Sequence, residues 1–386
     1  MRPLPTYQAL SHEQQDVYEL PVDGTYLVSG PPGTGKTVMA LYRAQQHVQQ
    51  GREVVLLSFS RLLNDYMGDE ARRLGLTETH VKTYTLWLKN LFNDRVPLLP
   101  NPRNKWDYDW SEIIRRAPDL PKVSSLVIDE GQDLPEEFYV LAREISDHLT
   151  VFADENQRIF EEQSTLAEIR IWMGNPPEYR LTRNYRNTRR IAQLAAHFYT
   201  GLQTGIPELP EEGDHEPAIL VKRFPEDRGS AERIVRQASL NKDNDERDTG
   251  VFAPDRNSAF FMRYRFLEDT ELEMREDRAD VWPNVLQHYF AWRPRSGPPA
   301  PEIEFGVPGV VLTNFFNAKG LEFDTVYLTR LQNLYRRLED PVTRMLFFVV
   351  ISRARTTLEF HYSGTGEPGI IEFLRDLPDG LVTFDT

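Results

Sequence analysis

The sequence predicts an α/β fold made of two domains, each with a parallel β-sheet. Short runs of apolar and β-branched residues alternate with segments of helical character along most of the chain, which is typical of parallel strands joined by helices. The length of 386 residues allows two hydrophobic cores of ordinary size. The nine candidate strands can be arranged as one open sheet, but two sheets of four or five strands fit the length better.

The predicted elements follow one another in a regular order. Helices are expected at residues 36–50, which Gly51 closes, and at residues 232–240. The candidate strands are residues 25–29, 54–58, 125–129, 149–154, 218–224, 250–253, 309–313, 325–329 and 357–362.

The domain boundary is expected at an Arg-rich stretch near residues 184–188, which ends the first group of strands. We therefore expect a first domain over residues 1–185 and a second over 186–386. Proline-bearing stretches predict one small insertion in each, at about 87–121 and about 257–308.

The composition excludes several classes of protein. With 45 basic and 59 acidic residues the formal charge is −14, which argues against a surface coated with basic charge but leaves room for one basic groove. The absence of cysteine excludes disulfides, thiolate zinc sites, iron–sulfur clusters and cysteine nucleophiles. No apolar run approaches the ~20 residues of a membrane span, and the first residues lack the apolar segment of a secretory signal. We expect a soluble, cytoplasmic protein with no membrane partner.

A phosphate-binding loop is predicted at residues 30–37, Gly-Pro-Pro-Gly-Thr-Gly-Lys-Thr, which follow a strand and open a helix. The glycines allow backbone N–H groups to turn toward phosphates, and the helix N-terminus adds favourable partial charge. Lys36 would reach the β- and γ-phosphates, and the Thr37 hydroxyl would hold Mg²⁺. An ordinary Gly/Pro turn is the weaker interpretation because all eight positions fit the motif. The residues expected at the nucleotide are Gly30, Gly33, Thr34, Gly35, Lys36 and Thr37.

Two carboxylates, Asp129 and Glu130, come directly after the apolar strand 125–129 and begin the sequence Asp-Glu-Gly-Gln-Asp. Asp129 can bind the metal through water, and Glu130 can orient and deprotonate an attacking water. An apolar strand that ends in two acids is unremarkable by itself. We favour catalysis because the pair lies 93 residues after Lys36, on what we expect to be a strand neighbouring the one before the loop.

These two motifs together resemble those of superfamily 1 helicases of the UvrD/Rep type, and the resemblance extends from about residue 10 to about residue 360. It implies two RecA-like P-loop NTPase domains with an ATP cleft between them. Leu-Ser-His-Glu-Gln is similar to the family's Q motif, so Gln14 would read the adenine edge. Ala-Asp-Glu-Asn-Gln-Arg-Ile-Phe is similar to the motif that senses the γ-phosphate, a role that falls to Gln157.

Three later motifs extend the resemblance into the second half. Leu-Thr-Arg-Asn-Tyr-Arg-Asn implies that Tyr185 stacks on the base and Arg186 contacts the γ-phosphate. Lys-Gly-Leu-Glu-Phe puts Gly320 and Glu322 near the ribose or phosphates. Val-Val-Ile-Ser-Arg-Ala makes Arg353 the arginine supplied by the second domain. Planar guanidinium groups suit the charge that spreads over a transferring phosphoryl group.

Contacts with a nucleic-acid strand are expected where the family's other motifs fall. This sequence departs from the family there, because Asn314 and Phe316 stand where relatives have Thr and His. Phe316 can stack on a base, a contact worth about 1–3 kcal/mol, or be buried, and the sequence leaves both open. The residues expected at the strand are Phe59, Thr83, Phe160, Asn314 and Phe316.

The favoured function is a Mg²⁺-dependent ATPase that moves along single-stranded nucleic acid, DNA before RNA, with 3′-to-5′ travel implied by the resemblance. The first alternative is a UvrD-like ATPase gated by DNA or by a protein partner such as a nuclease, without unwinding, as in phage defence or a toxin–antitoxin system. The short insertions, the residues at 314 and 316 and the charge of −14 fit that alternative. A nucleotide-binding scaffold without hydrolysis is disfavoured because the catalytic set is complete.

Overall fold

The computed structural model divides the chain into two compact units. The N-terminal unit takes in Pro3–Arg183 with Leu202–Pro207, and the C-terminal unit takes in Asn184–Gly201 with Glu208–Thr386. The structure describes residues 4–59, 71–77, 79–102, 106–154, 164–201, 205–211, 213, 216–240, 248–269, 273–274, 285–288 and 309–385.

The N-terminal unit contains a parallel six-stranded sheet with the order β3-β2-β4-β5-β1-β6. Its strands are β1 (Thr25–Ser29), β2 (Val54–Ser58), β3 (Val81–Thr83), β4 (Val123–Ile128), β5 (Ser146–Ala153) and β6 (Glu178–Arg180). Its helices are α1 (His12–Tyr18), α2 (Lys36–Gln49), α4 (Tyr84–Leu91), α5 (Trp110–Arg116), α6 (Glu136–Ile145) and α7 (Leu166–Trp172), with 3₁₀ turns at Tyr7–Ala9, Ala117–Asp119 and Gly131–Asp133.

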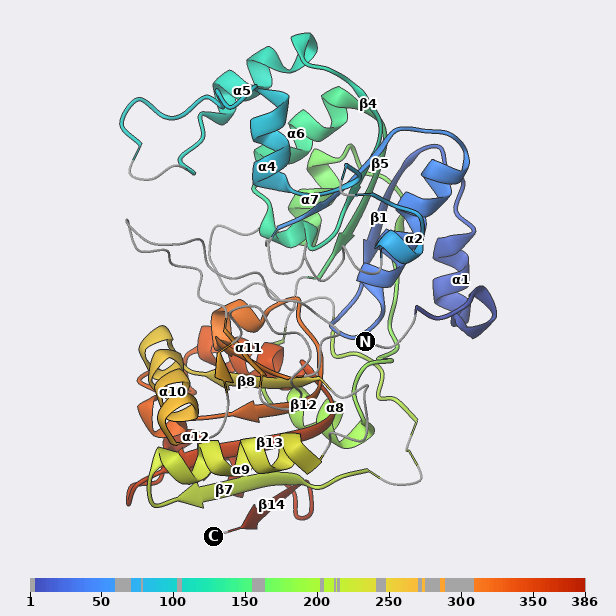
Figure 1. The fold of residues 1–386 in the computed structure, drawn as a ribbon. Helices are drawn as coiled ribbons and strands as arrows, with labels where there is room; N and C mark the ends of the chain where they lie inside the picture. Colours follow the sequence, from blue (N-terminus) through green and yellow to red (C-terminus); the bar gives the residue numbers. More distant parts are fainter. Residues whose placement is uncertain are drawn as a thin grey trace. The chain divides into compact units, whose positions relative to one another are not determined.

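Helices cover both faces of this sheet. Figure 1 shows α1 and α2 on one side and α4, α5 and α6 on the other. Alternate residues of one strand enter different cores, since Leu56 packs with the α2 side and Leu57 with the α6 side. Burial on both faces explains why β2 is apolar throughout instead of alternating with polar residues.

The C-terminal unit contains a parallel eight-stranded sheet with the order β14-β7-β13-β12-β8-β11-β10-β9. Its strands are β7 (Ile219–Phe224), β8 (Thr249–Ala253), β9 (Glu273–Met274), β10 (Val285–His288), β11 (Val310–Asn314), β12 (Phe323–Leu328), β13 (Ala354–Ser363) and β14 (Val382–Asp385). Its helices are α8 (Arg189–Ala196), α9 (Asp227–Leu240), α10 (Arg256–Asp269), α11 (Pro341–Ile351) and α12 (Gly369–Arg375), with 3₁₀ turns at Phe315–Ala318 and Leu331–Asn333.

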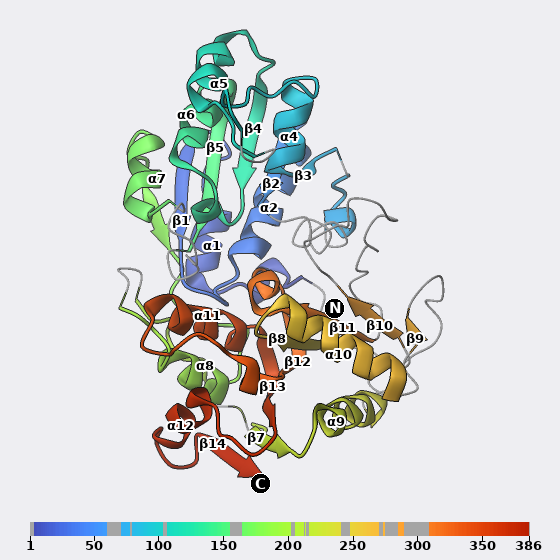
Figure 2. The ribbon, with the colours of Figure 1, turned by 90° about the vertical axis from the view of Figure 1, so that its left-hand side faces the viewer.

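This second sheet is also covered on two sides. Figure 2 shows α9 and α10 on one side and α8, α11 and α12 on the other. Ile234 of α9 and Met262 of α10 share a buried cluster with Val251 of β8 and Leu312 of β11. The chain therefore folds as two RecA-like α/β units, each built on a parallel sheet, as the sequence predicts.

The predicted strands are confirmed to within a few residues at each end, but the predicted sheet sizes are wrong. The sheets have six and eight strands in place of four or five. The additional strands, β3, β6, β9, β10 and β14, are only two to four residues long, which is too short for a clear apolar signal. The expected adjacency of the strand before the loop and the strand before Asp129 is also wrong, because β5 lies between β1 and β4.

The two stretches expected as insertions contain regular structure. Between β3 and β4 lie α4 and α5, and the buried Trp87 of α4 packs on Phe138 at a ring distance of 5.8 Å. In the stretch 257–308, α10 packs into the core of the C-terminal unit, and residues 270–272, 275–284 and 289–308 lie outside the described residues. Within the described ranges no helix combines the length and the apolar character needed for a membrane span.

Candidate functional site

The loop at residues 30–37 connects β1 to α2 and depends on its glycines. Gly33 and Gly35 have φ angles of 85° and 90°, a region that disfavours residues with a Cβ. A Cβ on Gly30 would lie 2.6 Å from the Leu181 carbonyl oxygen, and one on Gly35 would lie 2.5 Å from Gln14 Nε2. The predicted glycines are therefore required by backbone conformation and by close neighbours.

The ammonium group of Lys36 lies within this loop and is almost fully buried. Its Nζ donates to the carbonyl oxygens of Gly30 at 2.7 Å and Pro31 at 2.9 Å, and to Asp154 Oδ2 at 3.2 Å. Asp154 follows β5, the strand beside β1. A buried cation at the N-terminus of α2 is well placed to meet phosphate oxygens.

The predicted metal ligands lie together. Thr37 Oγ1 donates to Asp129 Oδ2 at 2.7 Å, although the two residues come from different elements. Asp129 Oδ1 is buried and has no hydrogen-bond partner among the described residues. Burial and the neighbouring Glu130 raise the pKa of Asp129 above its ordinary value, although the Thr37 hydrogen bond and Lys36 act to lower it. A buried carboxylate oxygen without a partner, next to a hydroxyl, fits a hard cation such as Mg²⁺.

Glu130 has an unusual backbone conformation for a residue with a side chain. Its φ and ψ are 55° and 44°, in the left-handed region, which costs about 1–3 kcal/mol and is frequent at functional sites. Its carboxylate accepts a hydrogen bond from Gln132 Nε2, and Gln132 Oε1 accepts from the Asp154 backbone N–H at 2.7 Å. Gln132 thus links the end of β4 to the end of β5 and holds Glu130 in position.

The comparison with protein families agrees with this geometry. Residues 14–162 match the family model of the AAA domain. The N-terminal unit contains a P-loop NTPase domain. Such a domain binds nucleotide, usually with Mg²⁺, and indicates an enzyme that hydrolyses ATP. A search of curated proteins finds no match to the chain.

Gln14, expected at the adenine, contacts the backbone of the P-loop. Its Nε2 donates to the Thr34 carbonyl oxygen at 3.0 Å, and its Oε1 accepts from the Ser11 backbone N–H at 3.1 Å. The second contact is one half of a capping box at the start of α1. Gln14 therefore connects the first helix to the loop of the NTPase domain.

In the C-terminal unit, Arg186 and Glu322 lie together as an ion pair. Arg186 Nε lies 3.1 Å from Glu322 Oε2, and Arg355 Nε lies 3.3 Å from the same oxygen. Burial acts to raise the pKa of Glu322, but Arg186 and Arg355 outweigh it and hold the pKa well below the ordinary value. Gly320, two residues before, has a φ of 80° that suits glycine. Tyr185, the neighbour of Arg186, is 45% exposed.

Arg353 is 1% exposed and bonds within its own unit. Its Nε donates to the Val349 carbonyl oxygen at 2.9 Å, its Nη1 to the Leu321 carbonyl oxygen at 3.3 Å, and its Nη2 to Ser352 Oγ at 2.9 Å. These contacts join the end of α11 to the turn before β12. Arg353 thus stabilises the backbone that carries Glu322.

The residues expected at a nucleic-acid strand form two groups. In the N-terminal unit, Phe59 is 40% exposed and stacks on Tyr84 at 5.7 Å, next to Thr83, which caps α4 and pairs in register with Ser58. The expected γ-phosphate sensor Gln157 and the strand contact Phe160 lie outside the described residues.

The second group follows β11 in the C-terminal unit. Asn314 Oδ1 accepts from the Asn317 backbone N–H at 3.0 Å and so caps the short turn that follows. Phe316 is half-buried, and the Arg336 guanidinium lies 5.5 Å from its ring centroid. The Phe316 ring is therefore neither fully buried nor fully exposed for stacking on a base.

The sequence reasoning missed the supporting residues Asp154, Gln132 and Arg355. Asp154 and Gln132 belong to the predicted motifs, but their contacts with Lys36 and Glu130 depend on the order of strands. Arg355 follows Arg353 by two residues on β13 and has no distinguishing signal among the many arginines of the chain.

Proposed function

We propose that this protein is a Mg²⁺-dependent ATPase that moves along single-stranded nucleic acid, DNA before RNA, in the 3′-to-5′ direction. The ATPase assignment rests on one observation: four residues lie together at the carboxyl ends of β1 and β4, namely Lys36, Thr37, Asp129 and Glu130. The motifs that resemble UvrD/Rep helicases support movement on a strand.

Each of these groups has a distinct task in the proposed hydrolysis. Lys36 exchanges its contact with Asp154 for the β- and γ-phosphates, which keeps its charge paired. Glu130 orients the attacking water and accepts its proton, with Gln132 fixing the carboxylate. Mg²⁺ held by Thr37 and Asp129 supplies positive charge that neutralises the phosphate oxygens.

The C-terminal unit contributes charge and base contacts in this proposal. Arg186 stabilises the negative charge of the transition state, as Gln157 does from the first domain, whereas the buried Arg353 holds the turn before Glu322. Tyr185 stacks on the adenine, and its exposed ring supports that role.

Contact with the nucleic-acid strand is proposed at Phe59 and Thr83. The exposed Phe59 ring is stacked on Tyr84, so it is held in one orientation and can receive a base on its free face. Asn314 and Phe316 are the proposed contacts in the C-terminal unit. Hydrolysis alters the conformation of the protein and advances the strand.

The test is steady-state ATP hydrolysis with Mg²⁺, with and without single-stranded DNA or RNA, over a series of salt concentrations. We expect stimulation by DNA that fades as salt rises, and loss of hydrolysis in Lys36→Ala. Phe59→Ala should weaken the stimulation without lowering the basal rate, whereas the matched control Leu86→Ala, another exposed apolar residue of this unit, should not.

A duplex-unwinding assay separates the proposal from its alternative. Unwinding by the purified chain, lost in Lys36→Ala, supports a translocating motor. Hydrolysis that neither DNA nor RNA changes contradicts the translocase and favours an ATPase gated by a protein partner.

A further inference from the structure

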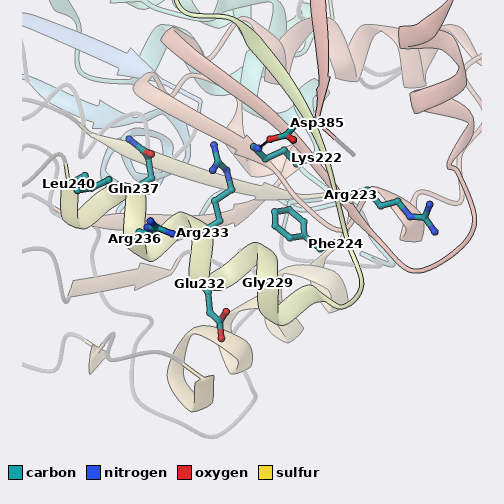
Figure 3. Close-up of a pocket in the computed structure, with 10 residues that line it drawn as sticks. All are labelled: Lys222, Arg223, Phe224, Gly229, Glu232, Arg233, Arg236, Gln237, Leu240 and Asp385. Carbon is teal, nitrogen blue, oxygen red and sulfur yellow. Dashed lines mark hydrogen bonds and ion pairs between the residues drawn. The ribbon is translucent and has the colours of Figure 1, made fainter.

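A groove of about 630 Å³ lies on the C-terminal unit, between α9 and the strands β7 and β14, and nothing in the proposed ATPase uses it. Figure 3 shows Arg233 extending from α9 toward the pair formed by Lys222 and Asp385, whereas Glu232 points away from that pair. The volume is in the range of ligand sites in proteins, which is about 300–1,000 Å³.

Most charged side chains at this groove are basic, although the protein as a whole is acidic. Arg233 Nε and Nη2 both donate at 2.7 Å to the carboxylate of Glu359, which is buried and also receives a hydrogen bond from His361. This two-point contact fixes the Arg233 guanidinium in one orientation. Glu232 lowers the positive charge little, since it pairs with Arg228 outside the groove.

Arg236, one helical turn further along α9, is exposed and has no ion-pair partner among the residues that the structure describes. Arg233 and Arg236 lie on the same face of α9, because residues three apart on a helix are neighbours. Within the described residues the groove therefore contains a guanidinium that Glu359 already pairs, that of Arg233, and one without an ion-pair partner, that of Arg236.

The C-terminal strand β14 already places an acidic side chain in this groove. Asp385 pairs in register with Lys222 of β7, and its carboxylate accepts a hydrogen bond from Lys222 Nζ. β14 is the outermost strand of its sheet, so its other edge pairs with no described strand. Unpaired backbone groups at a sheet edge are a template for an added strand.

We propose that this groove is a docking site for an acidic, extended segment of a partner protein, which adds a strand to the free edge of β14 and places a carboxylate on Arg236. The edge supplies backbone hydrogen bonds, and Arg236 selects an acidic side chain. A nucleic-acid strand fits less well, because among the described residues that line the groove the aromatic ring is that of Phe224, which is half-buried and offers no open stacking face. The site does not depend on the proposed ATPase function.

The test measures binding of a short fluorescein-labelled peptide that alternates aspartate and valine, by fluorescence anisotropy of the full chain without nucleotide. Arg236→Glu should weaken binding about tenfold, because one attraction becomes a repulsion. Arg337→Glu, the same charge reversal at an exposed position of this unit that does not line the groove, is the matched control and should leave binding unchanged. Asp385→Asn should strengthen binding, because it leaves Lys222 for the peptide.

The control peptides replace aspartate with lysine, or introduce proline to block strand pairing, and neither should bind. The proposal is overturned if the acidic peptide shows no saturable binding, or if Arg337→Glu weakens it as much as Arg236→Glu. It is also overturned if single-stranded DNA, and not the peptide, loses affinity in Arg236→Glu. An unchanged melting temperature of Arg236→Glu excludes misfolding as the source of its lower affinity.

Discussion

One buried carboxylate of the N-terminal unit, that of Asp129, and one of the C-terminal unit, that of Glu322, have opposite electrostatic surroundings. In the N-terminal unit, Asp129 lies beside Glu130 at the end of β4, with one buried oxygen unpartnered among the described residues, and its pKa is raised. In the C-terminal unit, Glu322 lies before β12 between Arg186 and Arg355, and its pKa is lowered. The positive charge near Asp129 is too small to offset burial and Glu130, whereas the two arginines beside Glu322 outweigh its burial.

This difference separates a site that needs a cation from a group of charged side chains that pair with one another without one. Crowded carboxylates destabilise the folded unit until a metal or a proton neutralises them. A carboxylate between two arginines stabilises the fold as it stands, since each charge has a partner. We expect substitutions in the N-terminal unit to change catalysis most and those around Glu322 to change stability most.

The largest expected effect is that of Glu130→Gln on catalysis. The amide cannot accept a proton, so kcat should fall about 10²–10⁴-fold while nucleotide still raises the melting temperature. Steady-state hydrolysis and thermal melting with ADP and Mg²⁺ measure the two quantities. Glu144→Gln, the same change at an exposed position of α6, is the control: its kcat should be unchanged, and nucleotide should raise its melting temperature as well. A kcat within a fewfold of the unaltered protein would remove Glu130 from the proposed role.

The second effect is that of Glu322→Gln on stability. Removing this charge leaves Arg186 and Arg355 without their shared partner, in a place where the Glu322 side chain is only 20% exposed. The loss should be about 2–3 kcal/mol, measured as a lower urea midpoint of the C-terminal unit's transition. Glu339→Gln, at an exposed position of the same unit, should change the midpoint little. An unchanged midpoint in Glu322→Gln would contradict the comparison.

The stability of the protein should also depend on pH through the lowered pKa of Glu322. The pKa of Glu322 is lowered in the folded protein from an ordinary value of 4.5, so the stability it contributes is fully present above that pH. It is lost as pH falls below 4.5 toward the folded pKa, because the unfolded chain then binds the proton first. As the pH is lowered through this range, the melting temperature of Glu322→Gln should fall less steeply than that of the unaltered protein. If the melting temperatures of the two proteins fell equally with pH, Glu322 would not be the group that makes stability depend on pH in this range.

The smallest effect, of the opposite sign, is expected for Asp129→Asn. The amide removes one of two adjacent buried charges and can still accept the Thr37 hydrogen bond, so without metal or nucleotide the unit should gain about 1 kcal/mol. Melting in EDTA measures this gain, and Mg²⁺ with ADP should stabilise the variant less than the unaltered protein. Destabilisation as large as that of Glu322→Gln would show that the two carboxylates do not differ as described.

Short-range patterns predicted much of the fold and the loop. The apolar runs of β1 and β2 match their strands residue for residue, because burial on both faces leaves a continuous apolar signal. The sequence predicts that glycines in this loop let backbone N–H groups turn toward phosphates, and Gly33 and Gly35 have the positive φ angles that glycine adopts readily. The short strands β3, β6 and β14 carried too few residues for such a signal.

The sequence by itself determined the two α/β units, the P-loop and the acidic end of β4, since each follows from neighbouring residues. Tertiary structure alone decided which distant groups meet them: Asp154 on Lys36 across 118 positions, and Arg186 on Glu322 across 136. It also decided that Arg353 is buried and that β5 lies between β1 and β4. The physical reason is that hydrogen bonds and ion pairs act over a few ångströms in space, and only the order of strands brings such residues within that range.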